Sequence, residues 1–129
     1  MALPVRDLFW VFVAGGTGAS LRVALVPLLD ERLQKSLPAG GTLVVNVLGC
    51  LAIGLGAAAL PHGSLRPILL GGLLGGFTTY SAFGLLTYAF AEEGRWGVFA
   101  AQVVLHVVLG LLAVGLGLWL GKTFAPSPS

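Results

Sequence analysis

Polar residues crowd the middle of one long apolar stretch, where they could bind ions. The segment GGFTTYSAF, residues 75–83, places Thr78, Thr79 and Ser81 shortly after two glycines. Because glycine ends helices and serine or threonine caps new ones, this pattern favours a helix that breaks inside the stretch. Carbonyls freed at such a break can hold a cation, and the new helix N-terminus can face an anion. The alternative is a continuous helix whose hydroxyls bond back to carbonyls four residues earlier.

Two aromatic residues follow on the second half of the same stretch. Tyr80 and Phe83 are three positions apart and therefore share a helix face. Aromatic rings carry a positive edge, which can attract an anion in a dry site. The same spacing also suits simple helix packing, so both interpretations stay open.

Polar residues also interrupt the other apolar stretches. Thr42 and Asn46 are four positions apart on one helix face, and so are Gln102 and His106. Polar groups are costly inside a bilayer unless they are satisfied, so these residues either line a pore or hydrogen-bond to neighbouring helices. Arg22 either extends to the lipid headgroups or places a positive charge in a water-filled vestibule that attracts anions.

Enzymatic chemistry is not indicated. The sequence has no nucleophile–base set, phosphate-binding loop or paired carboxylates, since Glu92 and Glu93 are adjacent and point in different directions. Cys50 stands alone, which excludes an intramolecular disulfide and a multi-cysteine metal site. The net charge of +2 is no footprint of nucleic-acid binding. We therefore predict neither an enzyme nor a nucleic-acid-binding protein.

The composition places these residues in a membrane protein. Of 129 residues, 9% are charged and 57% are apolar, with twenty glycines in addition and a mean hydropathy of +0.97. So little polar surface excludes a soluble globular domain, and so much apolar surface excludes disorder. A chain of this length crosses a bilayer about four times and leaves no room for a soluble catalytic domain. Residues 1–129 are therefore expected to form a single membrane domain.

Clusters of charge divide the chain into four apolar runs, at about 8–29, 40–60, 67–91 and 96–121. Each run is long enough to cross a bilayer. Backbone groups in lipid must pair within the segment, which makes these runs helices. The prediction is an all-α membrane protein with four transmembrane helices, the third of them broken at mid-membrane.

The basic residues outside the spans are balanced between the two sides of the membrane. Three lie on each side: Arg6, Arg66 and Lys122 on one, and Arg32, Lys35 and Arg95 on the other. Orientation follows the difference between such counts, and here the difference is zero. This balance favours insertion in both orientations, and hence an antiparallel, dual-topology homodimer. The alternative is that a short chain simply has few loop charges, or that the first helix decides the orientation.

Three segments together resemble a known family. GGTGASLR at 15–22, GTLVVNVLG at 41–49 and GGFTTYSAF at 75–83 are similar, in this order, to motifs of the Fluc (CrcB) fluoride channels. The resemblance covers about residues 8–121. It implies a dual-topology homodimer with two antiparallel pores, through which fluoride leaves the cytoplasm passively. It also implies a structural Na⁺ at the dimer interface.

The resemblance assigns roles to individual residues. Asn46 matches the pore asparagine, and Tyr80 and Phe83 match the two positions of the aromatic fluoride box. Gly75 and Thr78 match the residues whose backbone carbonyls bind Na⁺.

Further residues are assigned to the fluoride path in the same way. Arg22 matches the vestibule arginine, and Thr79 and Ser81 match the hydroxyls of the third span. Thr42, which shares a helix face with Asn46, is counted with the pore. His106 falls on the polar track of the fourth span.

This sequence departs from the family pattern at several of these positions. Tyr80 stands where phenylalanine is common, which adds a hydroxyl at the first box position. His106 and Gly110 stand where many members have serine. A histidine can titrate near neutral pH, and glycine offers no side chain, so the chemistry of the polar track differs here.

Two other functions compete with a fluoride channel. A small multidrug exporter is also four-spanning, but proton-coupled exchange needs a carboxylate inside a span, and the predicted spans contain none. A non-transporting assembly subunit would leave the polar series from Asn46 to Ser81 without a purpose. Small size and the lack of a transit peptide favour a multi-pass protein of the bacterial inner membrane.

Overall fold

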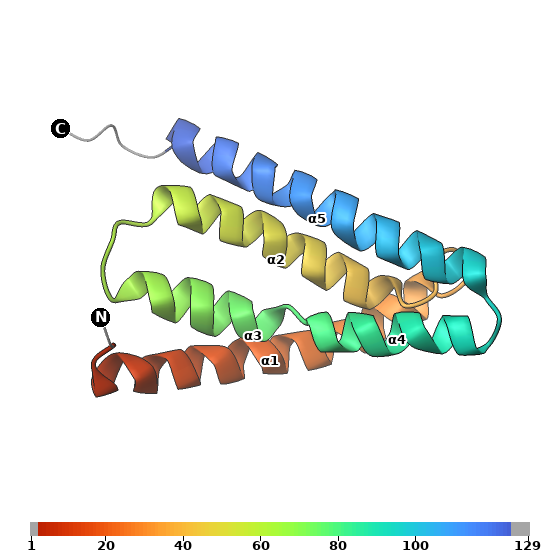
Figure 1. Ribbon diagram of the computed structural model, residues 1–129. Helices are drawn as coiled ribbons and strands as arrows, with labels where there is room; N and C mark the ends of the chain where they lie inside the picture. The colour runs from red at the N-terminus through yellow and green to blue at the C-terminus, as the bar shows by residue number, and fades with distance from the viewer. Residues whose placement is uncertain (1–2, 125–129) are drawn as a thin grey trace.

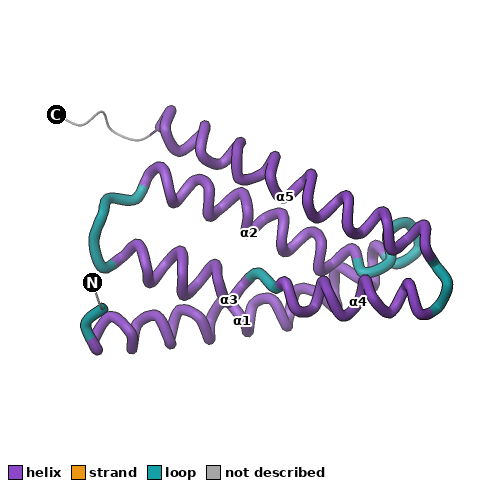
Figure 2. Tube along the Cα trace, in the orientation of Figure 1, coloured by secondary structure: helices purple, strands orange, loops and turns teal. Residues whose placement is uncertain are grey.

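The protein forms a bundle of helical spans in the computed structural model, which describes residues 3–124. The elements are α1 (Val5–Leu33), α2 (Gly40–Ala59), η1 (Pro67–Leu74), α3 (Gly75–Phe77), α4 (Tyr80–Glu92) and α5 (Trp96–Phe124). Four segments are long and apolar enough to cross a membrane, with η1, α3 and α4 together forming the third. The described residues contain helices and loops but no strand (Figure 2). This confirms the predicted all-helical, four-span architecture.

Successive spans run in opposite directions. Short loops join α1 to α2, α2 to η1 and α4 to α5, so the start of α1 and the end of α5 lie at the same end of the bundle (Figure 1). The third span begins as a π-helix, η1, which the sequence did not predict. It lies against α1, while α2 lies against α5.

The first helix extends beyond the apolar run from which its span was predicted. The sequence places Asp30, Glu31 and Arg32 in a loop, but they form the last turn of α1. The position of Asp30 is stabilised by a contact with the next helix, because its Oδ1 accepts a hydrogen bond of 2.7 Å from the Gly41 amide at the start of α2. A carboxylate at a helix N-terminus satisfies an unpaired N–H and suits the helix dipole. It also ties the two helices together.

Glycines allow α2 and α5 to approach closely. A Cβ atom at Gly54 would collide with the backbone at Val114, and one at Gly117 would collide with the backbone at Leu51 and Leu55. Further along, a Cβ at Gly121 would lie 2.7 Å from the Cβ of Ala58. The small-xxx-small pair of Gly54 and Ala58 therefore serves helix packing, as its spacing indicates.

Large apolar side chains are mostly on the outside. The buried apolar residues are Leu43, Val45, Phe90 and Ala113, whereas Leu111 and Leu112 of α5 are 70% and 64% exposed. Such an inside-out pattern suits a bundle surrounded by lipid, where close backbone packing replaces the hydrophobic effect between helices.

We predict that Gly117→Ala destabilises the bundle by about 1–3 kcal/mol, because the added methyl overpacks the contact between α5 and α2. Gly115→Ala, two residues away, is the matched control, since a Cβ there meets nothing within 4 Å. Thermal unfolding in detergent, followed by size-exclusion chromatography, measures both variants. Equal unfolding midpoints for the two would contradict this packing.

Candidate functional site

The chain is extended for two residues in the middle of the third span. Thr78 has ψ 159° and Thr79 has φ −149° and ψ 117°, between α3 and α4. Thr79 starts the next helix, because its Oγ1 accepts a hydrogen bond of 3.1 Å from the Ala82 amide. Thr78 Oγ1 donates to the Leu74 carbonyl at 3.0 Å. The capping and the back-bonding that the sequence offered as alternatives thus occur side by side, one at each threonine.

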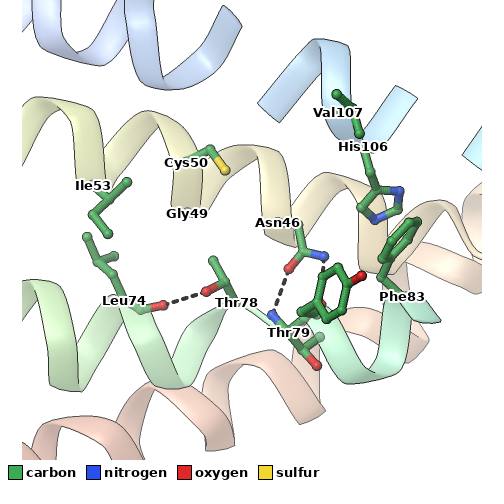
Figure 3. A pocket seen from close by; sticks show the side chains of 11 residues that line it. Asn46, Gly49, Cys50, Ile53, Leu74, Thr78, Thr79, Phe83, His106 and Val107 are labelled. Carbon is green, nitrogen blue, oxygen red and sulfur yellow. Dashed lines mark hydrogen bonds between the residues drawn. The ribbon is translucent and has the colours of Figure 1, made fainter. Parts of the chain in front are cut away.

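Asn46 of α2 binds this extended segment with both ends of its amide. Its Nδ2 donates to the Thr79 carbonyl at 2.9 Å, and the Thr79 amide donates to its Oδ1 at 2.8 Å (Figure 3). The side chain thus replaces the backbone partners that an extended residue lacks. The structure therefore supports Asn46 as a link between helices. A pore role is compatible with this link, since the Nδ2 group has a second N–H to donate.

A cavity of about 320 Å³ lies beside this link. It brings together the predicted residues Asn46, Thr78, Thr79, Tyr80, Phe83 and His106. Five further residues complete the lining, none of which the sequence singled out for the site: Gly49, Cys50, Ile53, Leu74 and Val107. Gly49, Cys50 and Ile53 follow Asn46 along α2 in steps that keep them on one helix face, and this spacing was the signal that could have found them.

Three rings form a continuous row along the cavity. The Tyr80 and Phe83 ring centroids are 5.6 Å apart with the planes tilted by 54°. Phe83 and His106 are closer, at 4.2 Å and 37°, and Figure 3 shows the imidazole next to the Phe83 ring. Tyr80 is 83% exposed, so one end of the row is open.

His106 and Gln102 bring polar atoms from α5 into the bundle. His106 Nδ1 lies 2.9 Å from the Gln102 carbonyl, and because a carbonyl only accepts, Nδ1 carries the proton. His106 Nε2 and Gln102 Oε1 are buried and have no hydrogen-bond partner among residues 3–124. Gln102 Nε2 donates to the Pro38 carbonyl, which attaches α5 to the loop before α2. Sequence reasoning did not find this contact.

The other predicted pore residues lie outside the cavity. Arg22 Nε donates to the Gly76 carbonyl at 3.2 Å, so its guanidinium lies at the interrupted span. The Ser81 hydroxyl lies 3.3 Å from Thr79 Oγ1, and this pair is exposed. Thr42 is only 2% exposed and does not line the cavity, although it shares a helix with Asn46.

The extended segment leaves two carbonyls without their helical partners. In a continuous helix the amides of Thr79 and Ala82 would pair with the carbonyls of Gly75 and Thr78. Here these amides donate to Asn46 Oδ1 and Thr79 Oγ1 instead. Backbone oxygens are the hard, neutral ligands that an alkali cation takes in interrupted membrane helices, so the carbonyls of Gly75 and Thr78 are the groups here that could hold a cation.

Comparison with known proteins places the chain among relatives of one kind. The family model described as "CrcB-like protein, Camphor Resistance (CrcB)" matches residues 9–118. A fluoride-specific ion channel FluC of Paracoccus denitrificans is 45% identical over 115 residues, covering 87% of this chain and 91% of that protein. The FluC proteins of Methylobacillus flagellatus and Solibacter usitatus are 41% and 40% identical and cover 87% of this chain, and 91% and 95% of their own lengths.

We predict that Asn46→Leu destabilises the protein by about 1–3 kcal/mol for each Thr79 backbone group that loses its partner. Cys50→Ala is the matched control, because Cys50 lines the same cavity one helical turn away and its thiol is free. The unfolding midpoint in detergent should fall clearly for the first variant and little for the second. An unchanged midpoint for Asn46→Leu would show that the link does not stabilise the fold.

Proposed function

The chain belongs to the CrcB-like family, and on this premise we propose that it is a fluoride channel through which fluoride leaves the cytoplasm passively. The observation that carries the proposal is the extended segment linked to Asn46, with Tyr80, Phe83 and the threonine hydroxyls around one cavity. All of these groups can present positive hydrogens or positive ring edges to an anion.

Fluoride is small and strongly hydrated, so a narrow path has to replace its water. The second N–H of Asn46 is one such replacement, and the Thr79 and Ser81 hydroxyls are others. Thr79 Oγ1 already accepts a bond from Ala82, so its hydrogen is free to point at Ser81 or at an ion. The edges of Tyr80 and Phe83 complete the shell.

The driving force comes from the membrane and not from a reaction. An inside-negative potential favours outward movement of an anion by about 2.3 kcal/mol for each 100 mV. We place the protein in the bacterial inner membrane, where it crosses the bilayer several times. Arg22, bonded to the Gly76 carbonyl, adds a positive charge near the path. Thr42 supports α2 beside Asn46 and is buried, so we assign it no direct contact with the ion.

We further propose that the interruption lies near the middle of the bilayer. Thr78 and Thr79 are the twelfth and thirteenth of the 26 residues from Pro67 to Glu92. An extended segment at this depth is tolerated only where protein covers it or where it lines a cavity. The links to Asn46 and Arg22 meet that condition.

A second copy of the chain, inserted in the opposite direction, would complete the pore. Tyr80 is 83% exposed in the single chain, so one wall of the path is missing. A Cβ atom added at Gly16 of α1 or Gly71 of η1 would meet nothing within 4 Å, which leaves these small residues free for close contact with another helix. The balanced basic residues allow both orientations, and hence an antiparallel homodimer with two pores.

The carbonyls of Gly75 and Thr78 from both copies would then hold Na⁺ at the dimer interface. The bound cation supplies a fixed positive charge in a low-dielectric region, which offsets the cost of dehydrating an anion. The protein contributes the geometry: Asn46 and the Thr79 cap occupy the two amides that would otherwise pair with these carbonyls.

A proton-coupled multidrug exporter is not supported. The acidic residues of the described spans lie in the first or last turns, at Asp7, Asp30, Glu31 and Glu92, and none lies near the middle. The relatives named above are fluoride channels.

We predict that Asn46→Asp and Phe83→Ile each lower fluoride efflux from proteoliposomes by about tenfold or more, equivalent to about 1.4 kcal/mol in the barrier. The first replaces an N–H donor with a negative charge, and the second removes a ring edge. Leu111→Ile, which changes a residue that is 70% exposed on α5, is the control and should retain the wild-type rate. A fluoride electrode measures the efflux, and full rates in both variants would refute the pore assignment.

We predict that Na⁺ stabilises the purified protein. A ligand that binds only the folded state raises stability by RT ln(1 + [L]/Kd), so the unfolding midpoint should rise with NaCl concentration. N-methylglucamine chloride at equal ionic strength controls for salt, and Gly115→Ala, remote from the carbonyls, should respond like the wild type. Equal midpoints in both salts would count against the sodium site.

A further inference from the structure

His106 presents an unpaired acceptor to the cavity in which an anion is expected. Its Nδ1–H is held by the Gln102 carbonyl at 2.9 Å, so in the neutral ring the lone pair is on Nε2. That nitrogen is buried and has no partner among the described residues, while the ring lines the cavity with Asn46 and Phe83. A buried lone pair repels an anion. The same atom, once protonated, becomes a charged donor that attracts one.

The Phe83 ring links His106 to the rest of the path. The two ring centroids are 4.2 Å apart and the planes are tilted by 37°, which places the imidazole near the face of the phenyl ring (Figure 3). A cation over an aromatic face is favourable, because it meets the negative side of the ring quadrupole. It also draws electron density toward that face, which makes the ring edge more positive and a better contact for an anion.

Other charges near His106 do not compete with this effect. The elements packed against α5 are α2 and α4. The titratable groups that these helices bring to the cavity are the Cys50 thiol and the Tyr80 phenol, and neither becomes positive in any protonation state. The carboxylate of α4, Glu92, is exposed at the far end of that helix, and α5 itself has Lys122 only in its last turn.

We propose that His106 is a proton-linked fluoride contact: Nε2 takes up a proton from water when fluoride enters the cavity and returns it to water when fluoride leaves. The proposal rests on the proposed fluoride function. Binding linkage is reciprocal, so a proton on His106 tightens fluoride binding by the same factor by which fluoride favours the proton.

The direct test follows the imidazole by NMR. In protein with ¹³C,¹⁵N-labelled histidine, His62→Asn removes the other histidine and leaves only the His106 signal. We expect the imidazolium form to persist to higher pH in NaF than in NaCl at equal ionic strength. Tenfold tighter fluoride binding to the protonated ring would move the titration by up to about one pH unit. Identical titrations in the two salts would overturn the proposal.

A flux measurement tests the same link in the membrane. Between pH 8 and pH 6, with equal pH on both sides, the fluoride concentration that half-saturates efflux should fall several-fold in the wild type. His106→Gln keeps a polar side chain but cannot titrate, and it should show no such change. Protein-free liposomes at each pH correct for leakage of HF. A variant that retains the full pH dependence would overturn the role of His106, whereas absence of wild-type fluoride flux at both pH values would refute the channel function itself.

Discussion

Two hydrogen bonds between the Asn46 amide and the Thr79 backbone hold the site together. An extended pair of residues within an apolar span leaves N–H and C=O groups without helical partners, and each such group is expensive in lipid. Asn46 satisfies one of each at 2.8 and 2.9 Å, Thr79 Oγ1 satisfies the Ala82 amide, and Arg22 binds the Gly76 carbonyl. Without these partners a continuous helix would be the more stable form of the third span, because it would pair these backbone groups.

The polar links work because glycines bring the backbones close enough. A Cβ at Gly49 would collide with the Thr78 methyl group. One at Gly76 would collide with the α1 backbone at Gly15, and one at Gly18 would collide with the backbone of the third span at Leu73. Gly49 lies nearly one turn from Asn46, so the same part of α2 provides both the space and the amide. A Cβ added at Gly71 or Gly16 would meet nothing within 4 Å, so these positions leave room for close contact with the proposed second copy.

Much of the architecture could be predicted from the sequence, because the physical rules involved are local. Charge clusters located the loops, hydropathy located the spans, and glycines followed by hydroxyl residues marked the place where Thr78 and Thr79 are extended. The pairing of Asn46 with Thr79, 33 residues later, could not be predicted in this way, and neither could the contacts of Arg22 with Gly76 or of Gln102 with Pro38. Such contacts depend on how the helices rotate against each other. The last turn of α1 was missed for a related reason, since Asp30 is held in the helix by the Gly41 amide of another element.

We propose that each chain forms half of a path that an antiparallel copy completes, and such a path requires selective passive flow of fluoride. The most direct measurement compares efflux of fluoride and chloride from liposomes that contain the wild-type protein, loaded with potassium salts and opened to K⁺ by valinomycin. We predict that fluoride leaves rapidly once the ionophore balances its charge, while chloride is retained. Retention of both ions, or equal efflux of both, would show that the protein is not a selective fluoride channel.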